Sequence, residues 1–106
     1  MRIKILVRKN LKMTEFKTAA QCVHAALNLY KLFPQDHWSC VVLGVSDKKF
    51  EERRDALMST VEQGEVGAAF YVVTDAGYTE VPPGTQTCLA FYEEDPRSPG
   101  DVKHGE

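Results

Sequence analysis

A carboxylate and three threonine hydroxyls lie close together in the second half of the chain. Asp75 is followed by Thr79, Thr85 and Thr87. Hydrolysis of an ester needs a group that accepts a proton from water, and donors that stabilise the oxyanion of the tetrahedral intermediate. A carboxylate can accept the proton, and hydroxyl groups can donate hydrogen bonds. The segment therefore has the groups for ester hydrolysis, although Asp75 before an Ala-Gly pair is, taken alone, also typical of an ordinary turn.

A second group of polar side chains falls near the start of a helical pattern. Lys17, Gln21 and His24 are separated by four and three residues, so a helix places them on one face. Taken alone, Lys17 is typical of a solvated helix residue, Gln21 of a surface amide and His24 of a packed structural histidine. Cys22 near His24 raises the alternatives of a thiol nucleophile or a metal pair. Residues two apart point to different faces of a helix, which disfavours both.

Four short runs rich in β-branched and aromatic residues predict strands. The run at residues 39–45 is continuously apolar, which is typical of a strand covered on both faces. Strands that alternate with helices indicate an α/β fold with a mixed sheet and helices packed on its faces. The strands are predicted at residues 2–8, 39–45, 68–73 and 86–92.

Two helices are predicted between these strands. Thr14 is expected to cap the first helix, which ends near residue 32 because Pro34 follows. Ser46 is expected to cap the second helix, with Gly64 as its C-terminal stop. The side chains expected to face the core are Ala19, Cys22, Val23, Ala26, Leu29 and Tyr30 on the first helix and Phe50, Leu57, Met58 and Val61 on the second.

Length and composition indicate one globular domain. The chain has 106 residues, of which 43% are hydrophobic and 26% charged. We expect the domain to cover residues 1–92 and a flexible polar tail to cover 93–106, because the tail has almost nothing apolar to bury. The first apolar run, residues 3–7, contains Lys4 and is too short for a membrane span or a signal sequence. We therefore expect a cytoplasmic protein with no membrane association.

Charge and cysteine content bear on the binding partner and on the state of the thiols. The net charge of -2 gives no overall attraction to nucleic acid, which normally binds a basic face. Cys22, Cys40 and Cys88 show no Cys-x-x-Cys spacing and lie in apolar segments, so we expect buried, reduced thiols. Arg8 and Lys12 are either phosphate contacts or solvated loop charges.

The connection between the last two predicted strands is expected to bring the two polar groups together. It has about a dozen residues and a Pro-Pro pair, and long ordered loops are often functional. Asp75 falls just past a strand end, where the start of the helix carrying Lys17 also points. We expect Lys17 and Asp75 to face each other across a shallow cleft that Thr79 and Thr87 line.

The two segments together resemble a known family. Lys-x-Ala-Ala-Gln-Cys-x-His-Ala begins at Lys17, and Asp-Ala-Gly-x-Thr-x-x-x-Pro-Gly-Thr-x-Thr begins at Asp75. This pair resembles the peptidyl-tRNA hydrolases of the archaeal and eukaryotic type, the type 2 family, and the resemblance covers residues 3–91. It implies a three-layer α/β/α fold around a four-stranded mixed sheet, commonly a homodimer, that acts on the ester joining a peptide to tRNA. It implies no metal and no organic cofactor.

The resemblance also implies roles for single residues. The family's catalytic lysine falls on Lys17, its aspartate on Asp75, and its two functional threonines on Thr79 and Thr87. Lys17 is then the cation that pairs with Asp75, keeps it ionised and attracts phosphate. The partner implied is peptidyl-tRNA. The residues expected to bind this substrate are Arg8, Lys12, Gln21, His24 and Thr85.

Three departures from the family pattern favour an alternative function. Where the family has Gly-Lys-Gly-Lys, this chain has Thr-Glu-Phe-Lys ending at Lys17, so Glu15 replaces a cation. Tyr78 stands where the family commonly has arginine, and the sequence predicts no amphipathic helix after the last strand. The alternative is a binding or regulatory module of the same fold, or an enzyme that acts on another acyl ester.

Overall fold

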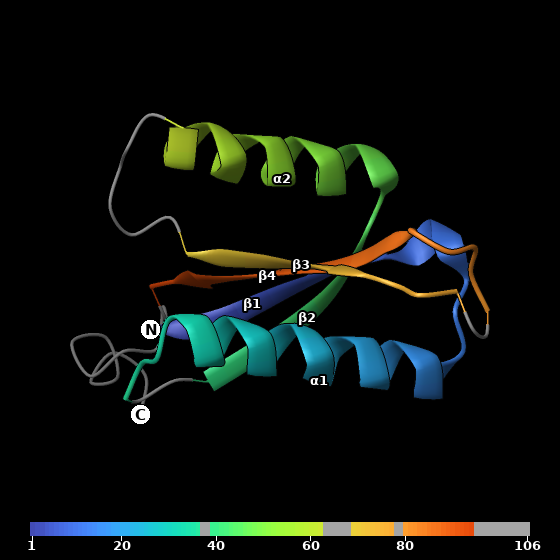
Figure 1. Ribbon diagram of the computed structural model, residues 1–106, viewed down its shortest axis with the longest axis horizontal. Helices are drawn as coiled ribbons and strands as arrows, with labels where there is room; N and C mark the ends of the chain where they lie inside the picture. Colours follow the sequence, from blue (N-terminus) through green and yellow to red (C-terminus); the bar gives the residue numbers. More distant parts are fainter. Residues whose placement is uncertain (37–38, 63–68, 78–79, 95–106) are drawn as a thin grey trace, which may run out of the picture.

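The protein has three layers, a four-stranded sheet with one helix on each face (Figure 1). The computed structural model describes residues 1–36, 39–62, 69–77 and 80–94. Within these ranges, no helix is long and apolar enough to cross a membrane. The elements in chain order are β1 (Arg2–Arg8), the short 3-10 helix η1 (Lys9–Leu11), α1 (Glu15–Leu32), β2 (Ser39–Val45), α2 (Asp47–Glu62), β3 (Phe70–Thr74) and β4 (Gln86–Glu93).

The sheet is mixed, with strand order β2-β1-β4-β3. β1 pairs with β2 in parallel, and β4 is antiparallel to both of its neighbours. β1, β2 and β3 therefore run in one direction, and their carboxyl ends meet at the edge on the right of Figure 1, where α1 begins. The predicted α/β fold is confirmed, with α1 and α2 on opposite faces.

The predicted helix caps are confirmed. The hydroxyl oxygen of Thr14 accepts the N–H of Lys17 at 3.2 Å, and that of Ser46 accepts the N–H of Lys49 at 3.2 Å. Each bond satisfies a backbone donor that the first turn of a helix leaves without an intrahelical partner. The predicted stop at Gly64 lies outside the described residues.

β4 extends one residue beyond the predicted domain boundary. Its last residue is Glu93, whose carboxylate pairs with Arg2 at 2.5 Å and with Lys4 at 3.7 Å. The acid therefore belongs to the sheet rather than to the predicted tail. Residues 95–106 of that tail lie outside the described residues.

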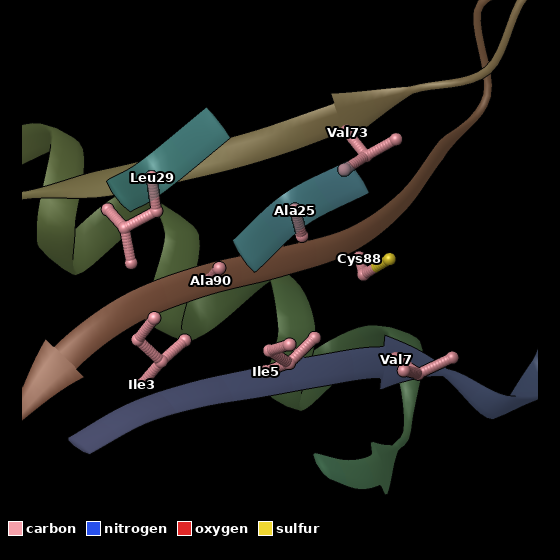
Figure 2. Packing of buried hydrophobic residues seen from close by; sticks show 8 residues of the cluster. All are labelled: Ile3, Ile5, Val7, Ala25, Leu29, Val73, Cys88 and Ala90. Carbon is pink, nitrogen blue, oxygen red and sulfur yellow. The ribbon is translucent and has the colours of Figure 1, made fainter. Parts of the chain in front are cut away.

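Two apolar cores lie on opposite faces of the sheet, because successive strand side chains alternate between the faces. On the α2 side, Phe50 packs with Leu6, Leu89 and Phe91. On the α1 side, Figure 2 shows the buried cluster. Its members are Ile3, Ile5, Val7, Ala25, Leu29, Val73, Cys88 and Ala90.

α1 buries a different stripe from the predicted one. Leu29 is buried as predicted, and Cys22 and Ala26 pack against the core, but the other buried positions are Gln21 and Ala25. Apolar residues lie on two faces of this helix, so their spacing alone does not decide which face meets the sheet. The predicted core positions that prove to be exposed are Ala19, Val23 and Tyr30.

The prediction that β2 is covered on both faces is wrong. β2 is an edge strand, and Val42 and Leu43 are 47% and 41% exposed. α1 lies over β4, β3 and β1, and α2 lies against the interior strands and, at the end of β2, against Val45. The middle of β2, with Val42 and Leu43, is left open. For the same reason Cys40 is exposed rather than buried. On α2, Met58 is exposed as well, against the prediction that it faces the core.

Candidate active site

A largely buried ion pair joins α1 to the loop after β3. Nζ of Lys17 lies 2.5 Å from Oδ2 of Asp75, and the two side chains are 14% and 5% exposed. Asp75 directly follows β3, and Lys17 lies in the first turn of α1. Both residues therefore come from the carboxyl edge of the sheet, and the structure brings them together as expected.

The Asp75 carboxylate accepts two further hydrogen bonds. Nε2 of Gln21 donates to Oδ2 at 3.2 Å, and the N–H of Gly77 donates to Oδ1 at 2.5 Å. Gly77 has a φ of 82°, and a Cβ there would lie 2.4 Å from the backbone nitrogen of Pro83, so only glycine fits. The hydrogen bond from Lys17 and that from the Gly77 N–H hold the pKa of Asp75 below its ordinary value, although burial opposes them. Asp75 therefore stays ionised at neutral pH.

A third buried polar residue supports Gln21. Oγ1 of Thr87 donates to Oε1 of Gln21 at 2.5 Å, and Thr87 is fully buried. The buried polar residues among the described ones are Gln21, Asp75 and Thr87. They form one hydrogen-bonded chain that ends at Lys17, and this chain satisfies the polar groups that would otherwise be costly to bury.

Thr87 lies beneath the site and does not line a cleft, which differs from our expectation. The register of β4 explains this position. Val73 pairs with Cys88 but Thr74 pairs with Gln86, so Thr87 is the extra residue of a β-bulge. A bulge breaks the alternation of side chains, and both Thr87 and Cys88 therefore face α1, with Oγ1 and Sγ 3.7 Å apart.

Thr85 braces the loop that carries Asp75. The Asp75 N–H donates to the Thr85 carbonyl at 2.8 Å, and the Gly84 N–H donates to the Asp75 carbonyl at 2.9 Å. The hydroxyl of Thr85 donates to the Pro82 carbonyl at 2.7 Å. These bonds join the two ends of the loop and fix the position of Asp75.

Glu80 is a site residue that sequence reasoning missed. Its Oε1 accepts the N–H of Thr14 at 2.7 Å, and its Oε2 accepts the Thr14 hydroxyl at 2.6 Å. These bonds, first that of the hydroxyl and then that of the N–H, lower the pKa of Glu80. The two residues lie 66 positions apart, and no sequence pattern connects them.

Arg8 and Lys12 lie at the same edge of the sheet, around a hollow of about 260 Å³ beside the start of α1. Arg8 is partly engaged, since its Nε donates to Asp47 at 3.0 Å and its Nη1 donates to the Gln86 carbonyl at 2.8 Å. Lys12 is exposed. The residues that line the hollow are Val7, Arg8, Lys9, Lys12, Met13, Thr18, Val42 and Gly44.

His24 does not share the hydrogen-bonded chain of the site. Its exposed side chain contacts Tyr71, with ring centroids 6.4 Å apart, while Cys22 packs against the core. Within the described part of the chain, no group of three His, Cys, Asp or Glu residues is arranged to hold a metal ion. The alternatives of a Cys22–His24 nucleophile or metal pair therefore gain no support. Thr79 and Tyr78 lie outside the described residues.

Fold and site together define a small α/β protein with a largely buried lysine–carboxylate pair at the carboxyl edge of its sheet. The comparison with known sequences agrees with this class. Residues 1–96 match the profile of the family described as Peptidyl-tRNA hydrolase PTH2. The chain belongs to the peptidyl-tRNA hydrolase PTH2 family.

Three relatives illustrate the similarity. The peptidyl-tRNA hydrolase of Methanothermobacter thermautotrophicus is 36% identical over 94 residues, which cover 86% of this chain and 84% of the relative. That of Thermococcus sibiricus is 35% identical over 95 residues, covering 82% and 79%. The human protein named peptidyl-tRNA hydrolase 2, mitochondrial, is 35% identical over 98 residues, covering 82% of this chain and 52% of the relative.

Proposed function

We propose that this protein hydrolyses the ester bond between peptide and tRNA in peptidyl-tRNA, and thereby recycles tRNA. The observation that carries the proposal is the largely buried ion pair of Lys17 and Asp75 in a chain that matches the PTH2 family over residues 1–96. Relatives named peptidyl-tRNA hydrolase support the substrate class.

Lys17 stabilises the oxyanion in this proposal. A lysine ammonium has three N–H donors, and the Lys17 ammonium contacts Asp75 on one side. The remaining donors are available to the carbonyl oxygen of the ester. As negative charge develops on that oxygen, a positive charge in a site with little water stabilises the transition state more than the ground state.

Asp75 accepts the proton of the attacking water and returns it to the leaving ribose oxygen of tRNA when the tetrahedral intermediate collapses. Its lowered pKa makes it a weak base in the free enzyme. The developing oxyanion then competes for the charge of Lys17, which raises the proton affinity of Asp75 as the reaction proceeds. Gln21 holds the carboxylate in place by a hydrogen bond, and Thr87 in turn holds Gln21. The role of Thr79, as a further hydroxyl donor, rests on the resemblance alone.

The basic hollow is the proposed contact for the tRNA backbone. Arg8 and Lys12 line it, and phosphate groups bind such cations with an affinity that falls as salt rises. Gln21 and Thr85 serve the substrate indirectly, because their described hydrogen bonds hold Asp75 and its loop. A substrate contact by His24 stays a prediction.

A second candidate is a module of the same fold, or a hydrolase for another acyl ester. Two acids near the start of α1 favour it. Glu15 is exposed in the first turn, and the carboxylate of Glu80 binds the cap residue Thr14. Both charges oppose a phosphate that approaches the N-terminus of this helix.

Peptide release distinguishes these candidates. Purified protein is incubated with an N-acetylaminoacyl-tRNA and, separately, with a small activated ester such as p-nitrophenyl acetate. We expect multiple turnover on the tRNA substrate and little on the small ester. Cleavage of the small ester alone would favour another acyl substrate. If neither substrate is cleaved, whether or not the protein binds tRNA, the binding or regulatory module remains as the candidate function.

We also propose that the protein forms a homodimer through the edge of β2. The strand has no charged residue in Ser39–Val45, and natural sheets usually protect an open edge with charge, proline or a bulge. Val42 and Leu43 point to opposite faces and are both exposed. A second copy that pairs β2 with β2 buries the same residues on each side, which is the arrangement of an isologous dimer.

The mass in solution tests this interface. Light scattering after gel filtration at micromolar concentration should give twice the chain mass for the parent and the chain mass for Val42→Lys. Val23→Lys is the matched control, because Val23 is 58% exposed on α1 and should leave the dimer intact. A monomeric parent, or a dimeric Val42→Lys, would exclude the proposed edge.

A cytoplasmic location is part of the same proposal. The three cysteines are free thiols, and one of them, Cys40, is exposed, which suits a reducing compartment. Fractionation of cells that carry the tagged protein should place it with cytoplasmic markers. Enrichment with an organelle, as the name of the human relative states for that protein, would contradict this location.

A further inference from the structure

Glu80 connects the loop that carries Asp75 to the helix that carries Lys17. Its two carboxylate oxygens accept the N–H and the O–H of Thr14, at 2.7 and 2.6 Å. Thr14 is the N-cap of α1, and its Oγ1 accepts the N–H of Lys17 at 3.2 Å. The Thr14 hydroxyl thus donates to Glu80 and accepts from Lys17 at the same time, and a hydroxyl in both roles polarises each bond.

This contact is separate from the bonds at the base of the loop. The base is closed where the Asp75 N–H meets the Thr85 carbonyl and the Gly84 N–H meets the Asp75 carbonyl. Glu80 leaves the loop at an exposed position, next to the buried Val81. It therefore attaches the outer part of the loop to the first turn of α1, three residues before Lys17.

We propose that Glu80 is a positioning residue for the reaction, which fixes the first turn of α1 against the loop so that the Lys17 ammonium stays in contact with Asp75. The effect on rate rests on the proposed hydrolysis. The effect on geometry does not, because it concerns only the contact between Lys17 and Asp75. A carboxylate at the N-terminus of a helix also interacts favourably with the helix dipole, which keeps Glu80 in this place.

Two roles of Glu80 predict opposite results when it is replaced. Suppose that Glu80 acts on Asp75 only as a nearby negative charge. Its removal then lowers the pKa of Asp75, because like charges oppose ionisation. If Glu80 acts by position, its removal lets Lys17 withdraw, and the pKa of Asp75 rises toward its ordinary value. The sign of the change therefore separates position from charge.

Three substitutions divide the two roles. Glu80→Gln removes the charge but keeps a carbonyl acceptor for Thr14. Glu80→Asp keeps the charge but withdraws the carboxylate by one methylene from Thr14. Glu80→Ala removes both. Glu51→Ala is the matched control, since Glu51 is an exposed acid on α2.

The first measurement is a carbon-13 NMR titration of the Asp75 carboxyl group, which needs no activity. We expect the pKa of Asp75 to rise in Glu80→Asp and Glu80→Ala, to stay or fall in Glu80→Gln, and to stay in Glu51→Ala. A fall or no change in Glu80→Asp would overturn the proposal. Because Glu80 is exposed, these substitutions leave the hydrophobic core unchanged. Comparison of Glu80→Asp with Glu80→Gln therefore separates position from charge even if Glu80→Ala does not fold.

The second measurement is the rate of peptide release. In Glu80→Ala and Glu80→Asp, kcat should fall about ten- to a hundredfold, the loss expected from a misplacement of about 1 Å. KM should change little, and the acid limb of the pH profile should move to higher pH. Glu80→Gln should retain most of the rate. If the parent releases no peptide, the proposed hydrolysis fails, while the titration still decides the role of Glu80.

Discussion

Replacement of Thr87 by valine should destabilise the protein although the two side chains have nearly the same shape. The change removes the hydroxyl that donates to Oε1 of Gln21 at 2.5 Å. Gln21 is 8% exposed, so its oxygen loses its partner where water is scarce. An unpaired buried acceptor costs about 1–3 kcal/mol. For a domain of about 100 residues this corresponds to a Tm lower by about 5–15 °C.

The same substitution should slow the reaction, because Gln21 also holds Asp75. Without Thr87 the Gln21 amide is free to turn, and its Nε2 then leaves Oδ2 of Asp75, which lies 3.2 Å away. We expect kcat to fall about tenfold, since a catalytic group that is less well held spends less time in the productive geometry. KM should stay near that of the parent, because fully buried Thr87 does not touch the substrate.

Circular dichroism on heating and steady-state peptide release measure the two effects. Thr87→Ser keeps the hydroxyl and should lie closer to the parent in both assays. Thr60→Val is the matched control on α2, where the hydroxyl donates to a carbonyl of the same helix. A double-mutant cycle with Gln21→Leu should give a coupling of at least about 0.5 kcal/mol. The reasoning is refuted if Thr87→Val matches Thr87→Ser in both assays, or if the two effects simply add.

Three further predictions concern the carboxylate, its loop and the helix start. Because Lys17 lowers the pKa of Asp75, the stability from Asp75 is present above its ordinary value and is lost as pH falls through the lowered value. Lys17→Met should therefore move acid unfolding, followed by circular dichroism, to higher pH, and an unmoved transition would contradict this. Gly77→Ala places a Cβ against Pro83 and should lower Tm by at least about 5 °C, which a thermal scan measures; an unchanged Tm would show that the loop yields. Glu15→Lys should steepen the log-log salt dependence of tRNA binding by about 0.7–0.9 if it meets a phosphate, and an equal slope by fluorescence anisotropy would show that Glu15 does not limit recognition.

Local signals predicted the elements well. The caps Thr14 and Ser46 both act through hydrogen bonds to the backbone three residues on, so a few neighbouring residues fix where each helix begins. Pro34 likewise stops α1 within its own neighbourhood. The convergence of Lys17 and Asp75 follows from strand direction, because the carboxyl ends of parallel strands share one edge. Features of this kind are encoded over short stretches of sequence.

Features that depend on tertiary packing could not be predicted. The apolar residues of α1 fit two faces, and the sheet selected the one with Gln21 and Ala25. Thr87 faces α1 only because a bulge shifts its register. Glu80 reaches Thr14 across 66 positions. Each of these outcomes depends on contacts between segments far apart in the chain, so the spacing of residues within one segment does not predict it.

Single-turnover release of peptide by Asp75→Asn tests the central claim most directly. With enzyme in excess over peptidyl-tRNA, the rate reports the chemical step rather than product release. Circular dichroism confirms that the variant is folded, and anisotropy confirms that it still binds tRNA. We predict a rate at least about a hundredfold below that of the parent, with tRNA affinity little changed. Peptide release by folded Asp75→Asn at the parent rate would contradict the account, because the carboxylate paired with Lys17 would then have no part in the reaction.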